Sequence, residues 1–194
     1  MPKPPIGANR LLHVFGGEIV ECEESISAAF NSLSSAVAHS PAPARLVHAA
    51  IRRILSDSAL ISLIFFPAKG SGRASQLAET RAAFLRAELH VDNTSLLKSR
   101  TVRNHISHLD ERLDTWAVES NSQTFGRGML GSRSDATRIG LSDQDILGLF
   151  DPRTFVFSFL KDDLRIDDLV GEVRAISHTV RRRLRDLPWQ EEVH

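Results

Sequence analysis

The sequence predicts one mainly helical domain, an all-α bundle of about five helices with a minor β-strand or hairpin near residues 153–160. Three observations predict this fold class. Apolar residues recur at intervals of three and four over most of the chain, which is the period of an amphipathic helix. Only residues 154–159 combine aromatic and β-branched side chains in the way a strand does. A length of 194 residues, of which 42% are hydrophobic, is sufficient for one domain with a full core.

Five helical segments are expected in order along the chain, separated by breaks that contain proline, glycine or short polar residues. In the first, Ile19, Ile26 and Leu33 repeat every seven residues and therefore share one face of a helix. Pro41 ends this segment, because proline cannot continue a helix. The expected helices cover residues 17–39, 44–55 with a restart at 58 and an end at 67, 74–89, 95–120 and 166–185.

Two regions lack helical periodicity. Residues 1–16 begin with several prolines and are expected to form an N-terminal arm, which leaves residues 17–194 as the helical domain. Residues 121–151 contain five glycines and many serine, aspartate and arginine residues without a sustained period. The sequence therefore predicts a long Gly/Ser-rich loop at 121–151.

Composition restricts the classes of function. No stretch of about 18 apolar residues is present, so no membrane span is expected. A single cysteine, Cys22, cannot form an internal disulfide, and this favours a reducing, cytoplasmic location. The 24 basic residues are balanced by 24 acidic ones, which argues against a protein that coats nucleic acid by charge alone. Contact with a short piece of RNA at one site remains compatible with this balance.

The expected helix at 95–120 contains the residues that are best suited to catalysis or ligand binding. Its apolar positions recur at intervals of four, three, four and three, so they form one buried seam. Asn104 and His108 fall on the polar side of the helix, close to each other, whereas His105 leans toward the seam. The seam consists of Val102, Ile106, Leu109, Leu113 and Trp116.

The string Arg103-Asn104-His105-Ile106-Ser107-His108 resembles the signature of the HEPN domain superfamily, in which an arginine and a following polar residue precede a histidine. The resemblance implies a bundle of four or five helices, commonly a two-fold homodimer with this helix near the interface. It also implies a hydrolase that cuts RNA without metal, as in toxins of toxin–antitoxin pairs and in antiviral systems. Arg103, Asn104 and His108 would then be catalytic. Arg100 and His105, the other arginine–histidine pair of this helix, are assigned to substrate binding.

The residue types fit that chemistry. Attack of a ribose 2′-hydroxyl on the adjacent phosphate needs proton transfer, which histidine performs near neutral pH, and positive charge, which arginine supplies. Arg103 and His108 lie about 140° apart around a helix, so a homodimer that combines groups from two copies would aim both at one phosphate. No histidine or cysteine cluster has metal-ligand spacing, and no glycine-rich phosphate loop is present. We therefore expect no metal and no cofactor.

Two alternatives remain at this point. Arg103 and His108 are also compatible with a solvated helix face that includes Asp110, Glu111 and Asp114. The main rival to an endoribonuclease is a non-catalytic helical homodimer that binds a protein partner or a nucleotide. A toxin held inactive by an antitoxin would be both a nuclease and a partner-binding protein.

Overall fold

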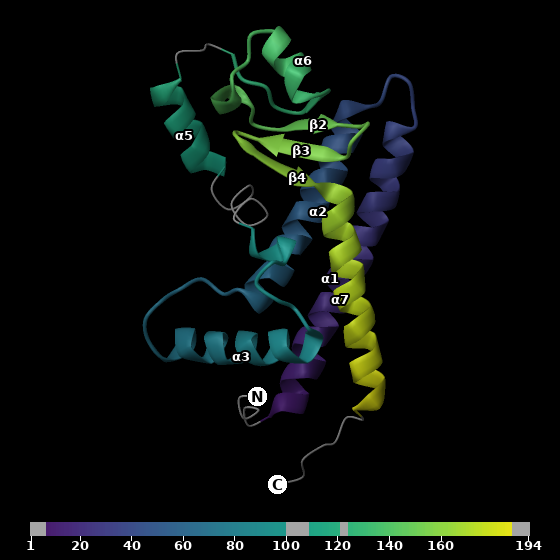
Figure 1. The fold of residues 1–194 in the computed structure, drawn as a ribbon, viewed down its shortest axis with the longest axis vertical. Helices are drawn as coiled ribbons and strands as arrows, with labels where there is room; N and C mark the ends of the chain where they lie inside the picture. The colour runs from purple at the N-terminus through teal and green to yellow at the C-terminus, as the bar shows by residue number, and fades with distance from the viewer. Residues whose placement is uncertain (1–6, 100–108, 121–123, 188–194) are drawn as a thin grey trace.

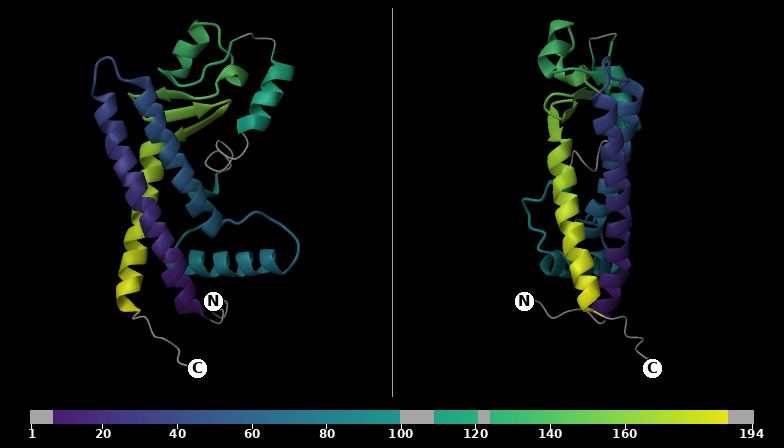
Figure 2. Two further views of the ribbon diagram at one scale, coloured as in Figure 1. Left: turned by 180° about the vertical axis from the view of Figure 1, so that it is seen from behind. Right: turned by 90° about the vertical axis from the view of Figure 1, so that its right-hand side faces the viewer.

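The computed structural model describes residues 7–99, 109–120 and 124–187. Three long helices lie side by side along the length of the molecule, and α1 packs against both of the others (Figure 1). The shorter helix α3 (Arg73–Leu89) extends to one side of them near one end, roughly perpendicular to their axes, and a small sheet lies at the other end (Figure 2). The three long helices are α1 (Ala8–Val37), α2 (Ala44–Phe65) and α7 (Ile166–Asp186).

The apolar stripe of α1 explains how the three helices pack. Leu12, Ile19, Ile26 and Leu33 are spaced by seven residues and are fully buried between α2 and α7. The helix begins at Ala8, so its first turns occupy part of the segment that was expected to be an N-terminal arm. These turns are stable as a helix because α7 covers them with its own apolar face, which a local sequence pattern does not reveal.

Three of the expected helices are confirmed with small differences. The segments expected at 44–55 and 58–67 form one unbroken helix, α2, and Asp57 and Ser58, at the expected restart, are buried within it. The segments expected at 74–89 and 166–185 correspond to α3 and α7.

The expectation of an all-α fold with a minor strand or hairpin is wrong, because the chain forms a four-stranded mixed sheet. The strands lie in the order β1-β2-β3-β4, with β1 and β2 parallel and the other pairs antiparallel. The short helices α6 (Arg133–Arg138) and η2 (Asp143–Asp145) connect the parallel pair. The strands are β1 (Met129–Leu130), β2 (Leu149–Asp151), β3 (Val156–Phe159) and β4 (Asp162–Arg165).

The sequence pattern does not reveal the sheet, because its strands are short and lie within glycine-rich sequence. Strands of two to four residues give too few positions for a period-two pattern. Gly131 and Gly148 adjoin two of them with φ angles of 141° and 139°, which other residues rarely adopt. The region expected to be a loop at 121–151 thus contains β1, α6, η2 and β2. β4 leads directly into α7, which ties the sheet to the helical layer.

The single helix expected at 95–120 is also corrected within the described residues. Residues 96–98 form a short 3₁₀ helix, η1 (Leu96–Lys98), and Ser99 then has an extended backbone with ψ at 133°. An α-helix, α5, covers Leu109–Glu119. Leu113 and Trp116, which the apolar seam was expected to bury, are half-buried against the main core. Leu96 and Leu97 of η1 pack in the same core, so η1 is also fixed to the helical layer.

Candidate functional site

The residues that the sequence singled out for catalysis and substrate binding lie outside the described part of the structure. These residues are Arg100, Arg103, Asn104, His105 and His108. Their roles remain predictions. The described portion of the same segment, α5, shows how its C-terminal end is held against the rest of the molecule.

The attachment of α5 centres on one buried carboxylate. Trp116 Nε1 and the Ser120 hydroxyl both donate hydrogen bonds to Asp145 Oδ1, at 3.0 and 2.8 Å. The amide and hydroxyl of Ser142 donate to the other oxygen. Burial raises the pKa of Asp145, but the hydrogen bonds from Ser142, Trp116 and Ser120 outweigh it and lower the pKa to about 2. Asp145 is therefore ionised at neutral pH and fixes α5 to the segment before β2.

A cavity of about 340 Å³ lies between α2 and the sheet and is a candidate for a ligand site. One wall is the N-terminal half of α2, and the other walls come from the segment before β1, the segment before β2, and β3. Its lining residues are Ala44, Arg45, His48, Ile51, Arg52, Leu55, Arg127, Gly128, Leu147, Gly148, Phe157 and Phe159.

Part of the cavity lining is apolar and buried. Phe157 and Phe159 project from β3 and are each only 6% exposed, and Ile51, Leu55 and Leu147 are buried beside them. The ring of Phe157 meets the ring of His48 edge to face, with 6.4 Å between centroids. Such a surface is complementary to a flat or apolar group of a ligand.

The remainder of the lining is basic. Arg45 and Arg52 come from α2 and Arg127 from the segment before β1, and all three are exposed. Among the residues that the structure describes, none of the three guanidinium groups forms an ion pair. The next residue on α2, Arg53, differs, because its Nε lies 2.9 Å from Asp57 and also donates to Ser25. The cavity thus gathers three cations that no described carboxylate neutralises.

The N-terminus of α2 adds to this positive character. Ala44 and Arg45 belong to its first turn, which contains no acidic residue, and the N-cap position is Pro43, which provides no side-chain cap. The partial positive charge of a helix N-terminus therefore lies beside the arginines without an acidic neighbour in that turn.

His48 has a defined protonation pattern. Its Nε2 lies 2.9 Å from the carbonyl oxygen of Met129, which can only accept, so Nε2 carries the hydrogen and donates it. Burial lowers the pKa of His48, and the charge of Arg52 lowers it further, while the bond to Met129 opposes both. At neutral pH the ring is uncharged, and Nδ1 is left as a hydrogen-bond acceptor. Among the described side chains that line the cavity, this nitrogen is the one hydrogen-bond acceptor.

Two glycines form part of the wall. Gly128 and Gly148 have positive φ angles of 71° and 139°, and a Cβ placed on Gly148 would lie 3.6 Å from the amide nitrogen of Gly128. Within the described residues, neither glycine amide donates a hydrogen bond to another backbone group. Glycine at both positions lets two stretches of backbone approach closely and leaves two N–H donors beside the cavity.

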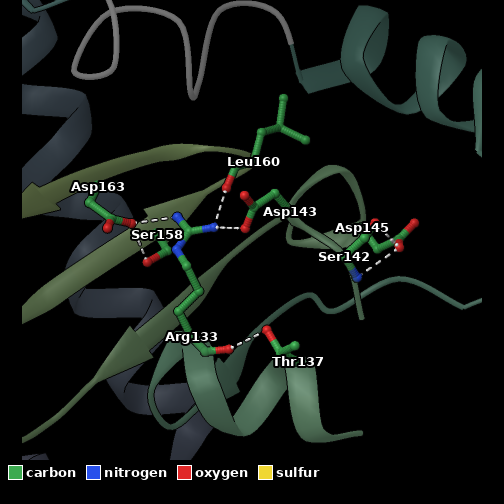
Figure 3. A network of polar contacts seen from close by, with 8 residues as sticks. All are labelled: Arg133, Thr137, Ser142, Asp143, Asp145, Ser158, Leu160 and Asp163. Atoms are coloured by element: carbon green, nitrogen blue, oxygen red, sulfur yellow. Dashed lines mark hydrogen bonds and ion pairs between the residues drawn. The ribbon is translucent and has the colours of Figure 1, made fainter. Parts of the chain in front are cut away.

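Arg133 stabilises the connection that carries these wall residues. Figure 3 shows its guanidinium between α6, the segment at Asp143 and the sheet. It donates to Asp143 and Asp163, both at 2.5 Å, and to the carbonyl oxygen of Leu160 at 2.9 Å. Ser158 donates to the same Asp163 oxygen. These contacts hold the β1–β2 connection onto β3 and β4, so Arg133 has a structural role rather than a place in the cavity.

A second cavity, between the end of α3 and α7, is a weaker candidate. Two carboxylates line it, and both are engaged in local structure. Glu172 accepts hydrogen bonds from the Ser95 hydroxyl and the Leu96 amide, which secures η1 to α7. Asp92 accepts hydrogen bonds from the amide and the hydroxyl of Thr94. In the described part of the chain, no three histidine, cysteine, aspartate or glutamate side chains are placed to hold a metal ion. None of the described helices is long and apolar enough to cross a membrane.

Comparisons with protein-family models, with curated proteins and with solved structures gave no match. Function must therefore be argued from the cavity and from the sequence. The cavity is not evident from the sequence, although one signal was present. Arg45, His48 and Arg52 are spaced by three and four residues and share a face of α2. Their partners from the sheet are separated from them by about 80 residues or more, as the contact of His48 with Met129 illustrates, and no local pattern connects them.

Proposed function

We propose that the protein binds a nucleotide in the cavity between α2 and the sheet. The phosphate would lie against the arginines, and the base would lie against the rings of Phe157 and Phe159. The observation that supports this most is the grouping of Arg45, Arg52 and Arg127, without described acidic partners, beside buried aromatic rings. The cavity volume of about 340 Å³ is within the range of about 300–1,000 Å³ found for small-molecule sites.

The hydrogen-bonding capacity of the lining supports the same ligand class. The three arginine side chains only donate, and His48 Nδ1 is the single side-chain acceptor among the lining residues that the structure describes. A complementary ligand therefore has several acceptor oxygens, few donors and an apolar ring. A nucleotide has these properties, because a phosphate accepts bidentate hydrogen bonds from guanidinium groups and a base stacks on aromatic side chains.

Calorimetric titration with adenosine 5′-monophosphate tests the proposal. Arg45→Ala and Arg52→Ala should each weaken binding about tenfold or more, since a hydrogen bond to a charged group contributes about 1.5–3 kcal/mol. Arg182→Ala is the matched control, because Arg182 is exposed near the far end of α7. Equal affinities in all three variants, or no binding to the unaltered protein, would refute the proposal.

A second candidate function rests on the sequence. The Arg103-Asn104…His108 spacing on the polar side of an apolar seam favours a metal-independent, HEPN-like endoribonuclease that acts as a homodimer. In this proposal Arg100 and His105 contact the RNA, and the protein works in the cytoplasm. Purified protein in EDTA should then cut single-stranded RNA and leave a 2′,3′-cyclic phosphate. His108→Ala should abolish cutting, and cutting that needs magnesium would contradict the mechanism.

A further inference from the structure

We infer that the cavity takes its nucleotide as a metal-free phosphate ester that carries one phosphate group, and that it rejects magnesium-bound di- and triphosphates. This inference rests on the nucleotide cavity proposed above and names the substrate class more narrowly. Three features of the cavity support it: the chemistry of its lining, the supply of positive charge, and the position of two backbone amides that donate to no described backbone group.

Among the described residues that line the cavity, none carries a carboxylate. Nucleoside di- and triphosphates commonly bind together with Mg²⁺, which prefers oxygen ligands and is usually held in part by aspartate or glutamate. The twelve lining residues comprise three arginines, one histidine, two glycines and six apolar residues. A magnesium ion that entered with a polyphosphate would meet guanidinium groups rather than carboxylates, and it would be repelled by them.

The positive charge of the cavity is free to meet a phosphate directly. Arg45, Arg52 and Arg127 have no described acidic partner, whereas the neighbouring Arg53 is paired with Asp57. A phosphate monoester carries at most two negative charges, so three guanidinium groups neutralise it without help from a metal ion. The uncapped N-terminus of α2 contributes further in the same direction.

Two backbone amides supply donors of the right kind. Neither Gly128 nor Gly148 donates a hydrogen bond to described backbone, and both line the cavity close to one another. Successive or adjacent free N–H groups bind anions in proteins. These amides and the arginines together provide donors for the oxygens of one phosphate. The cavity volume of about 340 Å³ leaves the remaining space for a sugar and a base against Phe157 and Phe159.

Calorimetric titration of the full chain with a panel of ligands tests the inference. The panel contains adenosine, inorganic phosphate, adenosine 5′-monophosphate and adenosine triphosphate, each in EDTA and in excess Mg²⁺. The monophosphate should bind with the same affinity, to within about twofold, in both buffers. It should bind about tenfold or more tightly than adenosine, phosphate or the magnesium-bound triphosphate. The reason is that only the monophosphate combines a base for Phe157 and Phe159 with a metal-free phosphate for the arginines.

The outcomes separate the two proposals. If magnesium strengthens the binding of any nucleotide, or if the magnesium-bound triphosphate binds best, a metal-free monophosphate site is refuted while nucleotide binding stands. If inorganic phosphate binds as tightly as the monophosphate, the site is a simple anion site and the ester is refuted. If no nucleotide binds in either buffer, the proposed function itself fails. Arg52→Ala, measured on the same panel, should weaken the monophosphate and leave adenosine unchanged.

Discussion

The indole of Trp116 donates a hydrogen bond to the carboxylate of Asp145, with 3.0 Å between Nε1 and Oδ1, and this contact attaches α5 to the segment that precedes β2. Asp145 is only 2% exposed, and Ser120 and Ser142 complete its hydrogen bonds. The ring of Trp116 also packs edge to face on Phe125, with 4.9 Å between centroids. The same segment continues within three residues to Gly148, so Asp145 fixes α5 and supports one wall of the cavity.

Replacing Asp145 should therefore destabilise the protein strongly. Asp145→Ala removes the buried carboxylate that accepts hydrogen bonds from Trp116, Ser120 and Ser142, and we expect a loss of about 2–4 kcal/mol in the free energy of unfolding. Denaturant titration measures this loss. Asp162→Asn is the control, because Asp162 is exposed on β4 and should change stability by less than about 0.5 kcal/mol. Equal effects of the two substitutions would mean that Asp145 does not anchor α5.

The same carboxylate predicts an acid transition. The pKa of Asp145 is about 2 in the folded protein, below its ordinary value of 3.8. A lowered pKa stabilises the fold above the ordinary value, and this contribution is lost as pH falls from about 3.8 toward 2. In a Trp189→Phe background, the fluorescence of Trp116 should report its release from Asp145 in that range. A transition of the same size and midpoint in Asp145→Asn protein would contradict the assignment.

His48 should titrate below its ordinary value of 6.5, because burial and then Arg52 lower its pKa against the opposing bond to Met129. The fold favours the neutral ring, so this contribution to stability is complete above pH 6.5 and declines as pH falls below it. Ring-proton shifts followed by NMR give the pKa directly. His48→Gln retains a donor for the Met129 carbonyl but does not titrate, so its stability should fall less over the same range. A His48 pKa above 6.5 would contradict the neutral, buried ring.

The crossing of α1 and α7 provides a matched pair of substitutions. A Cβ on Gly16 would lie 2.9 Å from Val180 Cγ1, whereas a Cβ on Gly17 would have no neighbour within 4 Å. Gly16→Ala should therefore cost about 1–3 kcal/mol through overpacking. Gly17→Ala should be neutral or stabilising by up to about 1 kcal/mol, because alanine is the better helix former. Thermal unfolding distinguishes them, and two stabilising substitutions would show that α7 does not pack closely on Gly16.

The helical layer could be predicted from sequence because its information is local. The spacing of Ile19, Ile26 and Leu33 predicts which face of α1 is buried, and the apolar positions of α7 predict its buried face in the same way. The sheet could not be predicted in the same way. Leu149 pairs with Met129 across 20 residues and with Ser158 on its other side, and these short strands are defined by their partners rather than by their own sequences.

The cavity illustrates the same limit. The spacing of Arg45, His48 and Arg52 places them on one face of α2, but this pattern alone is also typical of a solvated helix. What distinguishes them is the contact of His48 with Met129 and Phe157, which exists only after the sheet has folded onto α2. The motif at Arg103–His108 is the converse case, a local pattern whose residues lie outside the described part of the chain.

The most direct test of nucleotide binding in the cavity is an NMR titration of labelled protein with adenosine 5′-monophosphate. We predict saturable shifts of the Gly128 and Gly148 amides and of the His48 ring, with one common dissociation constant. The amide of Gly17, in the N-terminal half of α1 and therefore far from the sheet, should show no change in chemical shift. Saturable shifts confined to residues outside the cavity, or no shift at any concentration of the nucleotide, would contradict the account.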